Sequence, residues 1–329
     1  MNREGVIALD RGKATLVGES PLAHMSLLAG SPERVLALRL ALSSVVGPSS
    51  SVLDAGCGSL GILAIMAAKL GARRVVGVDL GRLELARALA EENGVAGRVR
   101  FLQRDLADLD GSLGTFDVIV GMIYCNDVRL DIPQQQLMSS LARRLAHSST
   151  AIIPNKVRYS VAGYAASAAD RSGLTGKGQW EESIEQVEGH TGVTLSLARR
   201  LLDQGWRDRQ GAGPLPPVAE VAGTGRGCAG RHTMKQLTAR QLFTEIEYSP
   251  AAAAWSYPPS VRLPVTQAGR LDTTVWRQDL LFDELLIRST ETAYRVTTPG
   301  RVAAGDTAVL STGGEWGDAI AFSVDRAMA

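Results

Sequence analysis

The chain has 329 residues, of which 45% are apolar and 21% are charged, and its formal net charge is +1. That length can bury two cores, while the balanced charge does not favour a nucleic acid or an anionic membrane as a partner. Three cysteines without metal-ligand spacing, and a first segment without a signal pattern, lead us to expect a cytoplasmic protein that holds no metal. Because Lys69 interrupts the most apolar segment, at 62–70, we expect no membrane span.

An amino-terminal helical cap is predicted over residues 1–50. Residues 1–20 show no clear periodicity and are interpreted as a loose leader or a short cap. Helices are expected between Pro21 and Leu42, because Ser31 precedes Pro32 in the order that commonly starts a helix and an apolar run follows.

Strand and helix patterns alternate over residues 51–154. Strands are predicted at 52–55, 74–78, 98–102, 116–120 and 150–153, with helices at 61–70, 81–93 and 133–146. Such alternation predicts a parallel, doubly wound, Rossmann-like α/β sheet, and ligands of these sheets bind beyond the carboxyl ends of the strands.

A glycine-rich turn, Gly56–Gly61, follows the first of these strands. Its spacing also fits a dinucleotide fingerprint, but Asp54 stands two residues before the first glycine. A carboxylate there would repel a pyrophosphate and attract an ammonium group, which S-adenosylmethionine carries. Asp79, at the end of the next strand, is placed to accept hydrogen bonds from a ribose. We therefore predict S-adenosylmethionine as the cofactor.

Residues 155–329 are predicted to be rich in β-structure. Short strands are expected within 242–248, 275–287, 292–296, 308–311 and 319–324. The segment 165–235 separates them from the first domain; it is polar and partly helical at its start and rich in Gly and Pro from 208 to 232. The Gly- and Pro-rich part is interpreted as a long loop or a mobile arm.

Four stretches, taken in order, resemble the protein arginine methyltransferases. Residues 52–79 resemble the first motif of the family, and residues 116–120 with Tyr124-Cys125 resemble its fourth strand and the following loop. Residues 152–155 are similar to its passage into the β-barrel, and Thr274–Gln278 to its Thr-His-Trp-Lys-Gln loop. The resemblance implies a Rossmann-like methyltransferase domain, then a β-barrel-like substrate domain with a helical arm at 165–235, and a possible homodimer through that arm.

The expected cofactor contacts lie in the amino-terminal helix and at the carboxyl ends of the strands. They are Arg34, Asp54, Gly56, Gly58, Asp79, Leu80, Asp105, Leu106 and Gly121. Among them, Arg34 is assigned to the cofactor carboxylate by the resemblance alone. Asp105 could accept from the adenine amino group, with Leu106 against the ring, or it could simply cap a helix facing solvent.

The expected substrate site departs from the arginine methyltransferases. Those enzymes hold a guanidinium between two glutamates, whereas no Glu occurs here from residue 94 through 179 and Met122 stands at the first glutamate position. Burying a cation without carboxylates carries a large desolvation cost, so arginine is not the expected substrate. The residues expected to line an apolar, aromatic pocket instead are Met122, Ile123, Tyr124, Asn126 and Trp276.

A neutral, flat substrate in this architecture resembles the bacterial indole C3-methyltransferases of natural-product pathways. By that resemblance we expect a small-molecule substrate, a tryptophan-derived indole that is methylated at C3 and closes to a pyrroloindoline. Tyr124 and Asp127 are the candidates for holding or deprotonating the indole N–H, with His24 in reserve.

Three alternatives stay open. One is N- or O-methylation of another small molecule. Another is a peptide or protein arginine methyltransferase whose acidic clamp is rebuilt with Asp127 or Asp131. The third is a protein that binds the cofactor without catalysing a reaction.

Overall fold

The computed structural model describes residues 7–10, 13–16, 28, 31–124, 128, 131–165, 184–185, 187–197, 200, 234–252, 256–312, 319–320 and 322–327. It begins with an antiparallel hairpin of β1 (Ile7–Asp10) and β2 (Lys13–Leu16), followed by the helix α2 (Pro32–Val45). The expectation of a loose leader over 1–20 is therefore wrong for residues 7–10 and 13–16. Strands β1 and β2 have four residues each, and such short alternating patterns are too weak to be recognised in the sequence.

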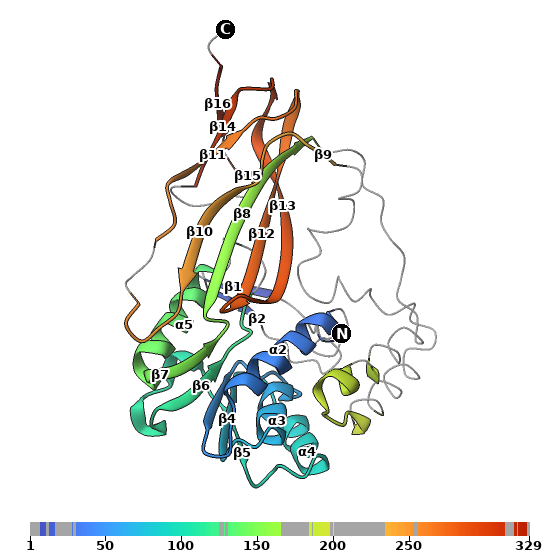
Figure 1. The fold of residues 1–329 in the computed structure, drawn as a ribbon, viewed down its shortest axis with the longest axis vertical. Helices are drawn as coiled ribbons and strands as arrows, with labels where there is room; N and C mark the ends of the chain where they lie inside the picture. The colour runs from blue at the N-terminus through green and yellow to red at the C-terminus, as the bar shows by residue number, and fades with distance from the viewer. Residues whose placement is uncertain are drawn as a thin grey trace.

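A five-stranded parallel sheet forms the lower half of the molecule (Figure 1). Its strand order is β5-β4-β3-β6-β7, with every neighbouring pair parallel. The strands are β3 (Ser51–Ala55), β4 (Arg74–Asp79), β5 (Val99–Gln103), β6 (Phe116–Val120) and β7 (Ala146–Ile153). All five residues of β3 are buried, as expected for a central strand covered on both faces.

The helices of this half are α3 (Ile62–Lys69), α4 (Glu84–Glu92) and α5 (Ile132–Leu145), with 3-10 turns η1 (Leu106–Asp108) and η2 (Gly111–Leu113). Helix α4 buries Ala86, Leu89 and Ala90, which share one face at helical spacing. The predicted alternation and the parallel Rossmann-like sheet are thus confirmed. The longest described helices, α2 and α5, have 14 residues each, and this is too short to cross a bilayer.

Strands that pair antiparallel, except for the parallel pair β13–β15, form the upper half (Figure 1). One sheet has the order β10-β8-β12-β13-β15 with β9 on β8, and a second has the order β11-β14-β16. The strands are β8 (Lys156–Ala165), β9 (Lys235–Gln236), β10 (Gln241–Glu247), β11 (Ser260–Pro264), β12 (Gly269–Phe282), β13 (Leu285–Val302), β14 (Thr307–Ser311), β15 (Ala319–Ile320) and β16 (Phe322–Asp325).

The segment 275–287 was expected as one strand, but it holds the end of β12, a turn at 283–284 and the start of β13. Asp283 adopts φ 51 there, a left-handed conformation that Asp tolerates in tight turns. The separate β-rich half is confirmed. The helical arm falls mostly outside the described residues, and the predicted division at 154 stays a prediction.

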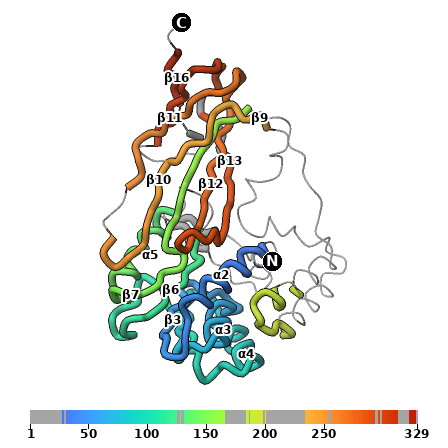
Figure 2. Tube along the Cα trace, viewed as in Figure 1, coloured from blue at the N-terminus to red at the C-terminus, as the bar shows by residue number. Residues whose placement is uncertain are grey.

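Two connections join the halves. Strand β7 runs almost directly into β8, and α2 packs against β13 (Figure 2). The carboxyl edge of the parallel sheet, where β7 ends, therefore faces the β-rich half. The amino edge lies at the opposite end of the molecule.

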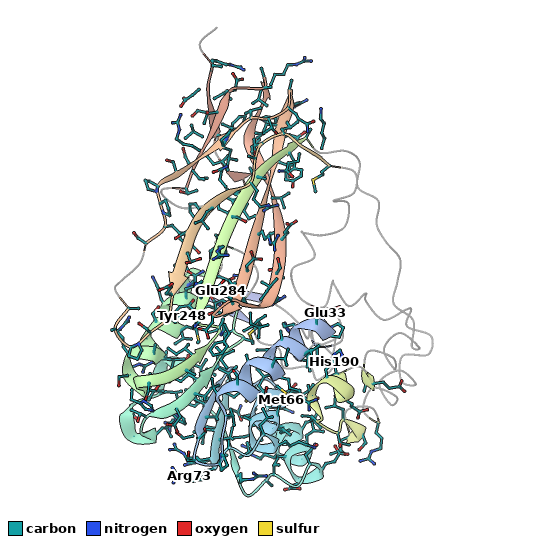
Figure 3. The ribbon with its side chains drawn as sticks, in the orientation of Figure 1. Glu33, Met66, Arg73, His190, Tyr248 and Glu284 are labelled. Carbon is teal, nitrogen blue, oxygen red and sulfur yellow. The ribbon has the colours of Figure 1, made fainter. Side chains whose placement is uncertain are left out.

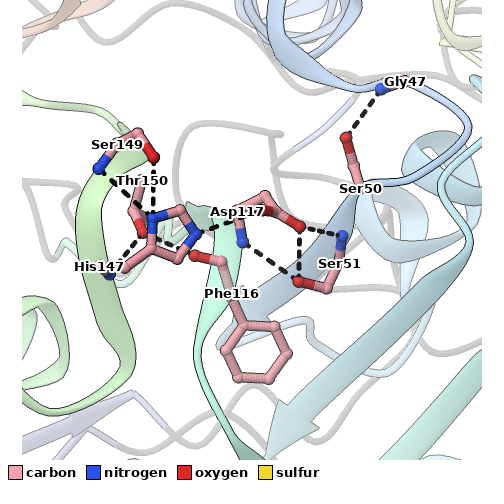
Figure 4. A network of polar contacts seen from close by, with 8 residues as sticks. All are labelled: Gly47, Ser50, Ser51, Phe116, Asp117, His147, Ser149 and Thr150. Atoms are coloured by element: carbon pink, nitrogen blue, oxygen red, sulfur yellow. Dashed lines mark hydrogen bonds and ion pairs between the residues drawn. The ribbon is translucent and has the colours of Figure 1, made fainter.

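A polar network ties three strands together at that amino edge (Figure 4). The Asp117 carboxylate accepts from the backbone N–H of Ser51 at 2.7 Å and from its hydroxyl at 2.8 Å. Its other oxygen lies 3.2 Å from Nε2 of His147. The bonds from Ser51 hold the pKa of Asp117 below its usual value. Because Ser51, Asp117 and His147 belong to β3, β6 and β7, the network fixes the register of these strands.

We expect Asp117→Asn to lower the free energy of unfolding at pH 7 by about 1 kcal/mol, since the side chain is half exposed and partly screened. A lowered folded-state pKa gives stability that is present above the unfolded value of about 3.9 and is lost as pH falls through the folded value. Urea unfolding of both proteins should therefore show the difference shrink below pH 4. Asp108→Asn, at an exposed carboxylate outside the network, is the control; an equal loss there would contradict the assignment.

Candidate active site

The glycine turn is held against the end of β4. The backbone N–H groups of Gly56 and Cys57 donate to the carbonyl oxygen of Val78 at 2.8 and 3.0 Å. Gly56 has φ 79, and a Cβ there would collide with the side chain of Ile123. Only glycine therefore lets the β6 loop close over the turn, which builds a cradle between β3 and the residues that follow β6.

Asp79 closes the far side of this cradle. One carboxylate oxygen accepts from the N–H of Gly58 and the other from the N–H of Gly81, each at 2.8 Å. The carboxylate thus sits at the mouth of the glycine turn. Leu80 beside it is exposed, which is unusual for a leucine in this half and leaves it able to contact a ligand.

Asp54 is fully buried beneath the turn. Its Oδ2 accepts from the N–H of Ala64, in the first turn of α3, at 2.9 Å. Its Oδ1 has no hydrogen-bond partner within the described part of the chain. Burial, and secondarily the charge of Asp79, raise the pKa of Asp54 to about 7 against the hydrogen bond from Ala64. A buried carboxylate with one orphaned oxygen suits a ligand that donates from a positively charged nitrogen.

Arg34 lies on α2 where this helix meets β13. Its side chain is buried, and burial followed by repulsion from Arg288 on β13 lowers its pKa to about 9. A cation in such surroundings favours an anionic group nearby. This position agrees with the carboxylate role expected for Arg34.

The positions of the other expected cofactor residues say less about a ligand. Asp105 accepts from the N–H of Ala107 at 2.8 Å, so it caps η1, and Leu106 packs into the core behind it. This cap is the alternative weighed from sequence, and it leaves one Asp105 oxygen to a ligand. Gly121 is buried against Met138.

A second polar group lies between the two halves, and we call it the interdomain cluster. Its members come from the β6 loop, α5, β8, β12 and the segments after β10. They are Tyr124, Asp131, Gln135, Tyr159, Tyr248, Tyr257 and Gln278. Figure 3 labels Tyr248 at the foot of β10, beside the parallel sheet.

Hydrogen bonds connect the members of the interdomain cluster. The Nε2 of Gln278 lies 2.6 Å from Oδ2 of Asp131 and 2.7 Å from the hydroxyl of Tyr159. Gln135 donates to the hydroxyl of Tyr159 at 2.5 Å and to that of Tyr257 at 3.1 Å. Asp131 is the only carboxylate that the described hydrogen bonds bring into the cluster.

Three polar atoms of the cluster remain without a hydrogen bond of standard geometry among the described residues. They are Oε1 of Gln278 and the hydroxyls of Tyr124 and Tyr248. The two hydroxyls interact with one another, but burial dominates and raises the pKa of both tyrosines. Tyr124 therefore stays protonated at neutral pH, which disfavours it as a base and suits it to anchoring a ligand.

The aromatic residue Trp276 sits deeper than expected. It is 2% exposed, its Nε1 donates to Thr274 at 3.1 Å, and its ring packs edge-on to Phe243 at 5.0 Å. Phe243 in turn contacts Tyr257. Trp276 thus belongs to an aromatic stack that supports the cluster. Met122 and Ile123 are half-buried at the cradle, and His24, Asn126 and Asp127 lie outside the described residues.

Sequence reasoning missed most of the cluster. Gln278 was present in the Thr274–Gln278 motif, and Asp131 was considered only as a replacement acid. Gln135 carries no sequence signal, because a glutamine on an amphipathic helix is ordinarily solvent-exposed.

Comparison with known proteins places the first half of the chain. Residues 7–153 match the family model of the ribosomal protein L11 methyltransferase, PrmA. A protein of that name from Pelotomaculum thermopropionicum is 43% identical over 101 residues, 30% of this chain and 32% of the relative. One from Methylobacillus flagellatus is 35% identical over 150 residues, 45% of this chain and 44% of the relative. The chain therefore spans less than half the length of these relatives.

The amino-terminal half is thus similar to class I methyltransferase domains. The methyltransferases that it matches support methyl transfer as its reaction and S-adenosylmethionine as its cofactor. The fold as a whole is similar to two arginine methyltransferases. One is the Trypanosoma brucei PRMT1 enzyme-prozyme heterotetrameric complex with AdoHcy, with a TM-score of 0.57 and 18% identity over 88% of this chain and 86% of that one. The other is Arabidopsis thaliana protein arginine methyltransferase 10, with a TM-score of 0.54 and 17% identity over the same shares.

The residues present fit this cofactor. The orphaned oxygen of Asp54 matches its ammonium group, the cradle at Gly56 admits a ligand against bare backbone, and Asp79 stands where a ribose diol would need an acceptor. The buried guanidinium of Arg34 would supply a cation for its carboxylate.

We expect the affinity for S-adenosylhomocysteine to rise with pH and to level off above about 7. The ammonium group needs Asp54 ionised, so binding must release its proton below pH 7, and affinity should fall about tenfold for each pH unit below that value. Calorimetry from pH 5.5 to 8.5 measures this directly. Asp54→Asn should weaken binding and flatten the profile, whereas Asp110→Asn, at an exposed carboxylate, should change neither. A wild-type profile that is flat across this range would overturn the role of Asp54.

Proposed function

We propose that this protein methylates a neutral aromatic small molecule that carries an N–H group, and that the acceptor binds at the interdomain cluster. The best candidate is C3 of a tryptophan-derived indole. The observation that carries the proposal is Oε1 of Gln278, which is buried and has no hydrogen-bond partner among the described residues. The hydroxyls of Tyr124 and Tyr248, which interact with one another, belong to the same cluster. A buried acceptor without a donor is costly, and an indole N–H would satisfy it without adding charge.

A cationic acceptor would bind less favourably at the same site. The oxygen Oδ2 of Asp131 already receives Gln278 Nε2 and the Tyr159 hydroxyl. A guanidinium buried there would meet one carboxylate rather than a pair, and its desolvation would be only partly offset. The charge balance of the cluster therefore favours a neutral ligand.

The cofactor supplies a methyl group already activated on a sulfonium. The chain has to hold the acceptor in line and exclude water. We propose that the cradle formed by Gly56, Gly58, Asp54 and Asp79 fixes the cofactor, with Arg34 at its carboxylate. Ile123 contacts the turn and Tyr124 follows it, so the β6 loop links the cradle to the interdomain cluster.

For an indole acceptor, Gln278 would accept from N1–H and increase the electron density at C3. Methylation at C3 leaves the ring cationic, with an iminium at C2 and N1. Closure of a side-chain nitrogen onto C2 and loss of its proton then gives the neutral pyrroloindoline. Tyr124, kept protonated by burial, would anchor the substrate rather than take this proton. Asp127 remains the candidate acceptor for it.

A protein acceptor is the second candidate. Asp131 places one buried carboxylate in the cluster, and the relatives of the first half are named ribosomal protein L11 methyltransferase. A rebuilt acidic clamp for a lysine or arginine side chain would use Asp131.

Self-association through residues 165–235 also stays a prediction, and sedimentation would test it.

Incubation with labelled S-adenosylmethionine and a panel of acceptors should separate these functions. We expect label in tryptophan-derived indoles, and none in arginine peptides or ribosomal protein L11. Mass spectrometry of the product should place the methyl on carbon. Label transferred only to peptides or protein would overturn the small-molecule proposal, and binding of the cofactor without any transfer would leave a binding protein.

Gln278→Leu should reduce kcat/KM for an N–H indole by about 10- to 100-fold, because a buried hydrogen bond of roughly 1–3 kcal/mol is lost. For the N1-methylated analogue, which cannot donate, the change should be much smaller. Gln135→Leu is the matched control, since Gln135 belongs to the same cluster but both of its polar atoms are engaged. If both variants alter the two substrates in the same ratio, Gln278 has only a structural role. Binding of S-adenosylhomocysteine reports that each variant is folded.

A further inference from the structure

A concavity lies at the amino edge of the parallel sheet, where β4 and β5 begin. It has a volume of about 270 Å³ and is lined by four arginines with Gly97 and valines of both strands. The four are Arg73, Arg74, Arg98 and Arg100. Figure 3 labels Arg73 at the lower end of the molecule, away from the β-rich half. The concavity is therefore separate from the cofactor cradle, which lies at the carboxyl edge.

The strand pairing brings these cations together. Strands β4 and β5 are parallel with Val76 opposite Arg100, and the N–H of Val75 donates to the carbonyl of Arg98. Arg74 is fixed by a hydrogen bond to the carbonyl of Leu113 at 2.5 Å and by the ring of Phe116, 4.9 Å from its guanidinium carbon. Like charges are thus held on neighbouring strands, which is unfavourable unless an anion lies between them.

Within the described part of the chain, no carboxylate lines the concavity. Among the described residues, Arg73, Arg98 and Arg100 make no side-chain hydrogen bond or ion pair. Two arginines of the β-rich half do have acidic partners, since Arg158 pairs with Glu245 at 2.7 Å and Arg262 with Asp325 at 2.6 Å. The chain as a whole has nearly equal numbers of acidic and basic residues, 34 and 35. The cluster is therefore a local excess of positive charge rather than a consequence of composition.

We propose that this arginine concavity binds an oligophosphate, a compact anion with the charge of pyrophosphate or triphosphate. Guanidinium groups bind phosphate oxygens in a bidentate manner and stay charged at every physiological pH. The volume is small for a drug-sized ligand but accommodates a short phosphate chain. No aromatic side chain lines it, so it offers no platform for stacking the bases of a nucleic acid.

Calorimetry with sodium triphosphate at low ionic strength tests the proposal, with S-adenosylhomocysteine at saturation so that the cofactor site is closed. We expect the wild type to bind triphosphate at least about tenfold more tightly than orthophosphate, because several guanidinium groups act on one ligand. Arg98→Gln with Arg100→Gln should weaken triphosphate by at least about tenfold. The control, Arg158→Gln with Arg262→Gln, removes the same charge from ion-paired positions and should leave the affinity nearly unchanged.

Three results would overturn the proposal. One is equal binding of orthophosphate and triphosphate, and another is an equal loss in the control variant, which would indicate a diffuse effect of net charge. The third is tighter, Arg98- and Arg100-dependent binding of a single-stranded RNA 12-mer, which would assign the face to nucleic acid. ATP compared with free triphosphate distinguishes a nucleotide-borne ligand from a free one. Failure of S-adenosylhomocysteine to bind would count against the cofactor assignment and not against this site.

Discussion

The carboxylate of Asp54 is buried where β3 turns into α3, and the arrangement of the cofactor cradle depends on the cost of burying it. Its one hydrogen bond, from Ala64, leaves an oxygen without a partner, and the charge of Asp79 nearby makes ionisation harder. A cationic ligand relieves both costs at once. The turn at Gly56 lets the side chain of Ile123, in the β6 loop, approach the backbone closely.

The interdomain cluster, where we propose that the acceptor binds, also holds a buried oxygen without a hydrogen-bond partner among the described residues. Its members come from elements far apart in sequence, with Gln135 on α5, Tyr159 on β8 and Gln278 on β12. The amide nitrogens of Gln135 and Gln278 donate hydrogen bonds within the network, which orients both side chains. Oε1 of Gln278 stays available to accept a hydrogen bond from a ligand. The neutral acceptor that we propose suits this balance, because one carboxylate already receives two donors.

The two ends of the parallel sheet differ in electrostatics. The carboxyl edge presents the acids Asp54 and Asp79, whereas the amino edge gathers arginines of β4 and β5 on one side and the Asp117 network on the other. A chain with almost no net charge can therefore carry two sites of opposite preference. The distance between the edges keeps one from neutralising the other, since solvent screens charges over such lengths.

By itself, the sequence determined the parallel sheet, the glycine turn and the two acids beside it, because these depend on local periodicity and on residues a few positions apart. It also indicated the β-rich half. It did not predict the turn at Asp283 or the pairing of β1 with β2, because the local sequence pattern does not show which short strands pair. Only the tertiary structure assembled the interdomain cluster and the arginine concavity. Gln135, Tyr159 and Gln278, like Arg73 and Arg98, become neighbours through strand order and domain packing, and no spacing in the chain encodes that proximity.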